Sequence, residues 1–437
     1  MLYLILKVAC MTSEISIEDG RIRATTLSNG FRVVTEHMPF VKSAALGVWV
    51  GAGSRNEVLA EAGLSHMLEH MAFKGTGGRS ARGIVEEIED VGGDLNAYTD
   101  FEMTAYQARV LAEHVPLALD IIADILRDST YADVEIERER HVILQEIGER
   151  NDMPSMVAME TLQEIAFPDQ PLGRPIIGTP ESVMSFDRDT IAGYMARHYV
   201  PSRMILSAAG YVDHDAIVRD AERLFGDMPV REAIPVEPGH YAPGRSVTIK
   251  PGEQAHVVFG FDAPDSRDIE AQFRAQTAAG VLGGGMSSRL FQEAREERGL
   301  CYSIFSYADA FADAGLMTVY AATSAEQSRE MADLILDVMA RAADEVTEAE
   351  ADRARAQSKA GMLMALESPM RRAETLARQI ALRGRPFPMS EIETIIDSVD
   401  AASVRAALRT VLDGPAPSAV YLGPEGGGLP DGLVSAA

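Results

Sequence analysis

A proline-rich stretch near the middle of the chain divides it into two halves of nearly equal size. Its residues fit neither helix interiors nor central strands: Pro229, Pro235, Pro238, Gly239, Pro243 and Gly244. The chain has 437 residues, which is more than one compact domain usually holds. The sequence therefore predicts two domains joined by a linker over residues 229–245.

The two halves resemble each other at an offset of 214 residues. Met103–Tyr106 ends a strand-like run before a helical pattern, and Met317–Tyr320 does the same 214 positions later. The helix expected around Glu139 has a counterpart around Arg353. The shared order of strands and helices supports this repeat more strongly than single residues do, and chance similarity is the alternative. Strands grouped beside paired helices in each half favour an α+β fold.

Local signals place two helix starts in the first half. Ser80 is expected to cap a helix that ends at residues 92–93, because a serine oxygen can accept hydrogen bonds from the first free N–H groups. Asp133 is expected to cap a helix that runs to Arg150 for the same reason. Between these helices, Leu95–Val110 is rich in Tyr, Thr and Phe and is predicted to be extended.

The amino-acid composition narrows the classes of function that the chain can have. Acidic residues outnumber basic residues by 66 to 40, which gives a net charge of −26. A nucleic-acid-binding protein normally has a basic face, so nucleic acid is not an expected partner. The excess acid either serves solubility or attracts basic peptides. The 2 cysteines, Cys10 and Cys301, exclude a disulfide framework and suit a reducing compartment, so a cytoplasmic location is expected.

The first residues do not form a convincing membrane or signal segment. The apolar run Leu2–Ala9 is interrupted by Lys7, is too short to cross a bilayer and lacks a clear small-residue cleavage site. Residues 1–10 are therefore expected to be an extension ahead of a start at Met11. No other segment is long and apolar enough to span a membrane, so no membrane partner is expected.

The motif His66-x-x-Glu69-His70 carries the chemistry. On a helix, the two histidines lie on one face and the glutamate projects to the same side. Two imidazoles at this spacing can bind one zinc ion, and the carboxylate beside them can take a proton from water. A surface helix with two solvated histidines is the alternative. A catalytic zinc site needs a third protein ligand, which another element must supply.

The helix expected over Asp133–Arg150 is the candidate source of that ligand. Glu139 and Glu146 are seven residues apart, so they lie on one helix face at the edge of an apolar stripe. Two carboxylates at the margin of a core are costly unless a positive group compensates them, and a zinc ion would do so. A pair of border carboxylates partnered by arginines is the alternative.

The motif and its surroundings resemble the M16 metallopeptidases, the inverted zincins. The resemblance rests on His66–His70 followed by Glu146, and on the flanking segments Gly63–Thr76, Leu95–Thr99 and Val142–Glu146. It covers about residues 23 to 420 and implies two homologous M16-type α/β sandwich domains that form a bilobal shell. The implied division is an N-terminal extension (1–20), a catalytic zinc-binding domain (21–228), the linker (229–245), an inactive homologous domain that closes the chamber (246–422) and a tail (423–437).

The resemblance also implies a role for each matching residue. His66, His70 and Glu146 would bind Zn²⁺, with one ion per chain. Glu69 would be the general base and later the proton donor. Glu139 would support the site without necessarily binding the metal.

Substrate contacts are implied in both halves. In the first half, an edge strand formed by Asn96, Ala97, Tyr98 and Thr99 would pair with the substrate backbone. Taken without the resemblance, these residues are typical of an ordinary strand. In the second half, Arg295 and Tyr302 resemble an Arg/Tyr pair that the family brings to the active site, where it would orient peptide carbonyls and stabilise an oxyanion. An exposed arginine and a core tyrosine are the alternative.

The second half cannot hold a second zinc ion of the same kind. At the offset of 214, the positions of the motif and of Glu146 fall on residues that offer no metal-binding side chain: Gly280, Gly283, Gly284 and Ala360. The resemblance implies that this half is an inactive copy that closes over the substrate.

Together these features predict a zinc-dependent endopeptidase or oligopeptidase that hydrolyses unfolded peptides and prefers basic ones. The resemblance implies a homodimer, or a heterodimer with a related M16 subunit. A non-catalytic or partner-dependent subunit of the family is one alternative, although its zinc motif would usually be broken. An acidic binding or chaperone-like module with structural zinc is another, and such a module has no use for Glu69.

Overall fold

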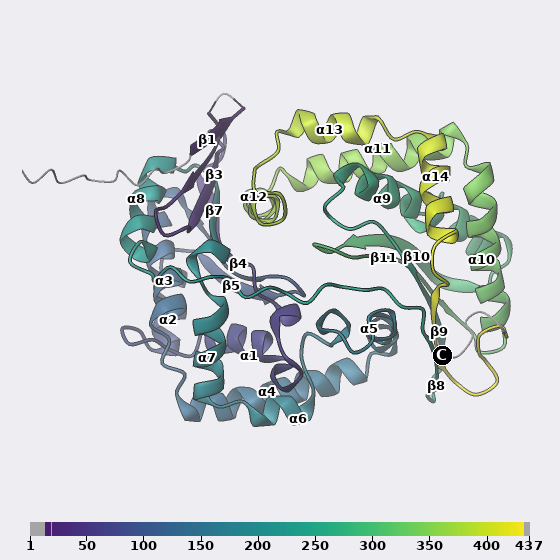
Figure 1. The fold of residues 1–437 in the computed structure, drawn as a ribbon, viewed down its shortest axis with the longest axis horizontal. Helices are drawn as coiled ribbons and strands as arrows, with labels where there is room; N and C mark the ends of the chain where they lie inside the picture. The colour runs from purple at the N-terminus through teal and green to yellow at the C-terminus, as the bar shows by residue number, and fades with distance from the viewer. Residues whose placement is uncertain (1–13, 19, 432–437) are drawn as a thin grey trace, which may run out of the picture.

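The computed structural model describes residues 14–18 and 20–431. It has two lobes, each built around one β-sheet with helices packed against it (Figure 1). The predicted α+β fold with two similar domains is therefore confirmed. The predictions for residues 1–10, which include Cys10, lie outside the described residues.

The sheet of the first half has seven strands in the order β1-β2-β3-β7-β4-β6-β5. All neighbours are antiparallel except β3 and β7, which run parallel. The strands are β1 (Glu14–Ile17), β2 (Ile22–Thr26), β3 (Arg32–His37), β4 (Ser43–Val50), β5 (Asp94–Thr99), β6 (Thr104–Leu111) and β7 (Met204–Gly210). The helices are α1 (Leu64–Met71), α2 (Ala81–Glu89), α3 (Val115–Arg127), α4 (Asp133–Asn151), α5 (Pro154–Ala166), α6 (Pro180–Ser185), α7 (Arg188–His198) and α8 (His214–Phe225).

The sheet of the second half has five strands in the order β10-β11-β9-β12-β8. Only β12 and β8 run parallel. The strands are β8 (Arg245–Ile249), β9 (Ala255–Asp262), β10 (Cys301–Ala310), β11 (Gly315–Thr323) and β12 (Ser418–Gly423). The helices are α9 (Ile269–Gly283), α10 (Ser328–Glu345), α11 (Glu348–Ala365), α12 (Pro369–Arg383), α13 (Met389–Asp397) and α14 (Ala401–Leu412).

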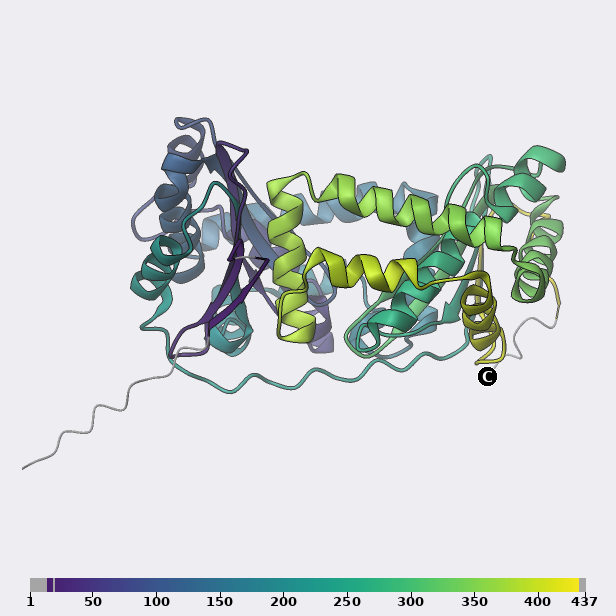
Figure 2. The ribbon, with the colours of Figure 1, turned by 90° about the horizontal axis from the view of Figure 1, so that it is seen from above.

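The repeat seen in the sequence corresponds to matching elements. The long helices α4 and α11 start at residues 133 and 348, and strands β6 and β11 start at 104 and 315, so both pairs lie close to the offset of 214. Residues 229–244 connect the two halves without a helix or strand, and Figure 2 shows them crossing from one lobe to the other.

Each half lends one helix to the sheet of the other half. Helix α12 packs on the first sheet in a core that includes Trp49 and Ile205, and α5 packs on the second sheet in a core that includes Val258 and Val420. Figure 1 shows both helices between the two sheets. Because both faces of the first sheet are covered, β4 is buried almost along its whole length and its sequence reads as a nearly continuous apolar run.

Two local predictions have different outcomes. Ser80 caps α2 as predicted, since its Oγ accepts a hydrogen bond of 3.0 Å from the Gly83 N–H. The prediction for Asp133 is wrong, because the capping residue of α4 is Ala132 and Asp133 is the first helical residue. An acidic side chain there still favours the positive end of the helix dipole.

The expected extended run Leu95–Val110 is divided into β5 and β6 by a turn over residues 100–103. Oδ1 of Asp100 accepts hydrogen bonds from the N–H groups of Glu102 and Met103, at 2.8 and 2.7 Å. Tyr, Thr and Phe in this run indicate strand but do not mark where the chain reverses. In the described residues, no helix combines the length and apolar character that a membrane crossing needs.

Candidate metal centre

Helix α1 is set in place at its first turn. Gly63 precedes it with φ of 91°, and a side chain there would approach the backbone of Gly178 to 2.7 Å, so only glycine fits. The buried carboxylate of Glu57 accepts hydrogen bonds from the N–H groups of Gly63 and Ser65, at 2.8 and 2.7 Å. Free N–H groups at the start of α1 are thereby satisfied by an acidic group at the positive end of the helix.

The two faces of α1 differ in character. Leu64, Met67, Leu68 and Met71 are buried in the core of the first half. The three residues of the predicted motif, His66, Glu69 and His70, are only partly buried and lie on the side that α4 and β5 approach. The helical period of 3.6 residues accounts for this division.

Helix α4 brings Glu146 to the two histidines. Oε2 of Glu146 lies 3.7 Å from Nε2 of His66 and 3.6 Å from Nε2 of His70. One ligand atom from each of the three residues falls within 4.8 Å of the others, and no other such group of three occurs in the described part of the chain. Zinc with ligands at its usual distances has tetrahedral edges of about 3.3–3.5 Å. The donor set and its spacing therefore fit a zinc ion.

Glu139 lies behind His70. Its Oε2 accepts a hydrogen bond of 2.9 Å from Nδ1 of His70, and its Oε1 lies 2.7 Å from Nζ of Lys74. With Nδ1 bonded in this way, Nε2 of His70 keeps its lone pair for a metal. Burial tends to raise the pKa of Glu139, but the hydrogen bonds from His70 and Lys74 outweigh it and hold the pKa below its usual value. Glu139 therefore orients His70, a candidate ligand, and stays charged.

The histidines differ in how they are held. Burial lowers the pKa of His66 to about 4, with a contribution from the neighbouring His70, so its ring is neutral at physiological pH, as a zinc ligand must be. Nδ1 of His66 is buried and has no hydrogen-bond partner among the described residues. The orientation of His70 is thus fixed by a carboxylate, whereas that of His66 depends on packing.

The general-base candidate is bonded to the neighbouring strand. The hydroxyl of Thr99, at the end of β5, donates a hydrogen bond of 2.6 Å to Oε2 of Glu69. Burial raises the pKa of Glu69, and the Thr99 hydrogen bond partly offsets this effect. A carboxylate with a raised pKa is better suited to accept a proton near neutral pH.

Strand β5 is an edge strand, with β6 as its only sheet neighbour among the described residues. Ala97 belongs to the core under α1, and Asn96 is exposed, with its Oδ1 accepting a hydrogen bond of 2.8 Å from the Ala97 N–H. Tyr98 points to the opposite face of the sheet and packs beside Trp49. The free edge of β5 can accept another extended chain.

Arg295 and Tyr302 pair with each other in the second half. The guanidinium of Arg295 lies 4.7 Å from the ring centres of both Tyr302 and Phe291, a cation–π arrangement. The Tyr302 side chain is 77% exposed, so the alternative of a core tyrosine is wrong. In the described structure, neither residue makes a hydrogen bond or ion pair with α1 or α4, so they are not assembled with the metal cluster.

The positions that match the motif in the second half serve packing. Gly283 ends α9 against β10, where a side chain would approach the Ser306 backbone nitrogen to 2.6 Å. A side chain on Gly280 would contact Ala354 at 3.5 Å, where α9 meets α11. Small residues allow the close approach of backbone here, in the place where the first half carries the candidate ligands.

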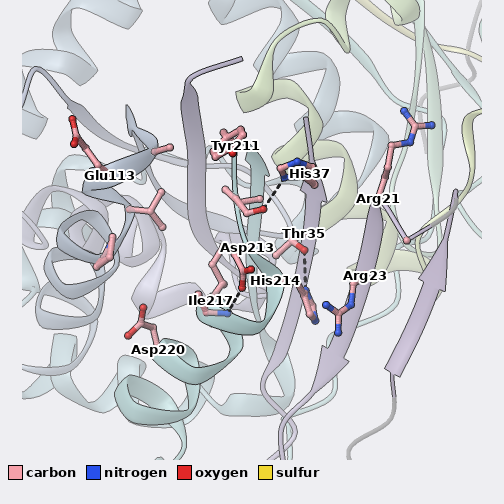
Figure 3. A pocket seen from close by; sticks show the side chains of 16 residues that line it. Arg21, Arg23, Thr35, His37, Glu113, Tyr211, Asp213, His214, Ile217 and Asp220 are labelled. Carbon is pink, nitrogen blue, oxygen red and sulfur yellow. Dashed lines mark hydrogen bonds between the residues drawn. The ribbon is translucent and has the colours of Figure 1, made fainter. Parts of the chain in front are cut away.

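A cavity of about 840 Å³ lies elsewhere in the first half, between β2, β3 and the first turns of α3 and α8 (Figure 3). Both ring nitrogens of His214 are hydrogen-bonded, to the hydroxyls of Thr25 and Thr35, each at 2.8 Å. Nδ1 of His37 donates a hydrogen bond of 2.9 Å to the carbonyl oxygen of Val212. These nitrogens are engaged within the protein, so the cavity does not compete with the α1–α4 cluster as a metal site.

Two residues that position the side chains of the site were not identified from the sequence. Lys74 lies three residues beyond the end of α1 at Met71, so helical spacing does not place it beside the Glu139–His70 pair. Glu57 reaches the start of α1 from an irregular segment, and no spacing rule points to it. Thr99 was expected only to contribute to a strand that binds substrate, and its bond to Glu69 depends on how α1 and β5 pack.

Each half of the chain matches a known protein-family model. Residues 32–180 match the model described as insulinase, peptidase family M16, and residues 185–358 match the model described as the inactive domain of peptidase M16. The chain is 39% identical over 398 residues to a protein of Rickettsia bellii named as an uncharacterized zinc protease, covering 91% of this chain and 96% of that one. Likewise, it is 40% identical to a Mycobacterium tuberculosis protein (92% and 93% covered) and 36% identical to a Bacillus subtilis protein (89% and 95%), both named as zinc proteases.

Solved structures show the same fold. A protease from Helicobacter pylori superposes with a TM-score of 0.86 at 21% identity, covering 95% of this chain and 99% of that one. A Pseudomonas fluorescens structure described as a peptidase M16 inactive domain superposes with a TM-score of 0.84 at 19% identity, covering 93% and 98%. Both halves of the chain therefore have structural counterparts.

Proposed function

The chain belongs to peptidase family M16, and we propose that it is a zinc-dependent endopeptidase or oligopeptidase that hydrolyses unfolded peptides. One observation carries this proposal: two imidazole Nε2 atoms and a carboxylate oxygen converge within 4.8 Å, with the carboxylate of Glu69 on the same helix. His66, His70 and Glu146 would hold the ion, which would supply Lewis-acid chemistry, since zinc polarises a carbonyl and makes water easier to deprotonate. A purely structural zinc site would not need Glu69.

Glu69 performs the proton transfers in this proposal. Its carboxylate takes one proton from the water that attacks the peptide carbonyl carbon, and a new C–O bond forms. The same carboxyl then gives the proton to the amide nitrogen as the C–N bond breaks. Thr99 holds one carboxylate oxygen at 2.6 Å, which leaves the other oxygen free to face the water. Tyr302 and Arg295 would stabilise the negative charge on the carbonyl oxygen if the two halves close over the peptide.

Substrate binding is proposed at the free edge of β5. An extended peptide would add to this edge by backbone hydrogen bonds through residues Asn96–Thr99, which places it beside Glu69. Only a chain without stable structure of its own can present a free backbone there, which supports unfolded peptides as the substrate class.

A preference for basic peptides is a further proposal. It rests on the net charge of −26, which produces a field that attracts cations. Cleavage of a basic peptide should then slow as salt rises from 50 to about 500 mM, because screening shortens the range of this field. Equal salt dependence for a neutral peptide of the same length would contradict the preference.

Stoichiometry, assembly and compartment are also proposals. One zinc ion per chain is supported by the single three-ligand cluster among the described residues. A homodimer, or a heterodimer with a related M16 subunit, is suggested by the resemblance to the family. A reducing compartment such as the cytoplasm is suggested by the presence of only 2 cysteines.

The experiment for the proposed activity uses the full chain, a mixture of unfolded peptides and mass spectrometry of the products. Cleavage should stop when a chelator removes zinc and should return when zinc is added back. Cleavage that persists in the chelated protein would contradict the proposal. A zinc-loaded chain that is inert alone but cuts after addition of a related subunit would instead identify a partner-dependent subunit.

A further inference from the structure

Strand β5 is held from the side opposite α1 by a helix of the second half. The hydroxyl of Tyr98 donates a hydrogen bond of 3.1 Å to Oε1 of Glu374 on α12, and it accepts one of 3.1 Å from Nε1 of Trp49. Burial raises the pKa of Tyr98 to about 12, so the phenol stays protonated and remains a donor. Tyr98 is the residue next to Thr99, and alternate side chains of a strand point to opposite faces. The strand is thus held on one face by α12 and on the other by Glu69.

A second contact from α12 fixes the turn that follows β5. Nη2 of Arg378 lies 2.7 Å from Oδ2 of Asp100, the residue after Thr99. Oδ1 of Asp100 closes the turn by accepting from two backbone N–H groups. Arg378 also lies one helical turn from Glu374, with its Nε 3.4 Å from Oε1 of that residue. One face of α12 therefore contacts two alternate positions, Tyr98 at the end of β5 and Asp100 in the turn that follows.

Helix α12 is anchored on the first sheet independently of β5. Its apolar face, which includes Leu376 and Ile380, packs in the same core as Trp49. The hydroxyl of Ser207 on β7 donates a hydrogen bond of 2.7 Å to the carbonyl oxygen of Ala373. Arg372 forms an ion pair with Glu36 on β3. Figure 2 shows α12 lying across the first sheet. By contrast, β5 has one sheet neighbour, so α12 is the firmer element of the two.

We propose that Tyr98 and Glu374 are positioning residues, through which α12 of the second half holds β5 so that Thr99 remains bonded to Glu69. This inference rests on the proposed peptidase function. It gives the second half a role in catalysis that acts through the back of the sheet and requires no side chain of that half at the metal cluster. A shift of about 1 Å in β5 would break the Thr99 bond, and misplacement of this size can lower a rate severely.

The test uses the zinc-loaded full chain with Tyr98→Phe, Glu374→Met and the double variant. Tyr98→Phe leaves the Trp49 N–H without its acceptor and so costs stability, whereas Glu374→Met keeps that bond. Two measurements are made on each: amide hydrogen exchange in residues 94–103, and kcat and KM for an internally quenched peptide. Glu36→Gln is the matched control, since it weakens the Arg372 ion pair of the same helix away from β5.

Both single variants should exchange faster in residues 94–103 and lose about tenfold in kcat. The double variant should lose less than the product of the two single losses, because both changes break the Tyr98–Glu374 bond and each also removes a separate contact, to Trp49 or to Arg378. Glu36→Gln should lower the melting temperature but leave kcat and exchange in β5 unchanged.

Two results would overturn the proposal. The first is unchanged exchange in residues 94–103 in both single variants, which would show that the Tyr98–Glu374 bond does not hold β5. The second is faster exchange with an unchanged kcat, which would show that the hold does not affect catalysis. A wild-type chain that retains zinc but cuts no peptide refutes the proposed function and, with it, the catalytic role of this contact. The exchange measurement then still decides whether the Tyr98–Glu374 bond holds the strand.

Discussion

The Oγ1 hydroxyl of Thr99 lies 2.6 Å from Oε2 of Glu69, which joins the end of an edge strand to the helix that carries the zinc motif. This hydrogen bond fixes one oxygen of the carboxylate and leaves the other free. It also connects the strand proposed to bind the peptide backbone with the residue proposed to move protons. The position of a bound peptide and the orientation of the base are therefore linked.

Removal of this hydroxyl should slow the reaction. We expect Thr99→Val to lower kcat by about 10- to 100-fold, because a hydrogen bond to a charged group contributes about 1.5–3 kcal/mol. Thr99→Ser keeps the hydroxyl and should retain most of the activity. Steady-state kinetics on one peptide checks both variants, and equal losses in the two would mean that the methyl group of Thr99 matters and its hydroxyl does not.

Glu139 should tune zinc affinity without being a ligand. We expect Glu139→Gln to weaken zinc binding by about 10- to 100-fold, because its negative charge orients and polarises His70. Competition with a chromogenic chelator measures the affinity. His141→Gln, a change at a well-exposed position on the same helix, is the control and should bind zinc as the wild type does. Unaltered affinity in Glu139→Gln would remove this supporting role.

Protonation of His198 should destabilise the first half of the chain in acid. Its buried ring packs against Tyr194 with 4.5 Å between ring centres, and burial, together with the charges of Arg203 and Arg197, lowers the pKa of His198 to about 4. The unfolded chain takes up this proton near pH 6.5, so the stability contributed by the neutral ring is complete above pH 6.5 and is lost as pH falls toward 4.

His198→Phe removes this proton uptake and keeps a ring against Tyr194. Between pH 7.5 and 5, the free energy of unfolding of the wild type should fall by about 2 kcal/mol more than that of the variant. Urea denaturation at the two pH values measures this difference. Parallel pH dependence in the two proteins would show that His198 does not carry the effect.

Tyr302 should matter for catalysis and not for folding. Its side chain is 77% exposed and makes a cation–π contact with Arg295. If the second half closes over a bound peptide, Tyr302→Phe removes one donor to the developing oxyanion and should lower kcat by about 10- to 100-fold, with an unchanged melting temperature. An unchanged kcat would place Tyr302 outside the active site.

The sequence was informative where the chemistry is local. His66, Glu69 and His70 lie within one and a half helical turns, so their shared face follows from the helical period alone. Glu139 and Glu146 also share a face, so the residues alone left both open as ligands. Their distinction depends on the crossing of α1 and α4, which sets Glu146 against both Nε2 atoms and Glu139 against Nδ1 of His70.

Contacts between distant segments could not be predicted. Tyr98 and Glu374 are 276 residues apart, and no local pattern indicates that α12 crosses to the sheet of the first half. The periodicity of α12 predicts an apolar face but does not identify the surface that this face covers. The predicted cap at Asp133 was wrong for a different, local reason, since sequence patterns identify a helix start only to within a residue or two.

The central claim is that Glu69 is the general base of a zinc peptidase, and Glu69→Gln tests it most directly. The variant and the wild type are compared for zinc content and for cleavage of the same unfolded peptides by mass spectrometry. We predict that both bind zinc equally, while the variant cuts at least about 1,000-fold more slowly. A zinc-loaded Glu69→Gln variant that cuts at the wild-type rate would contradict the claim.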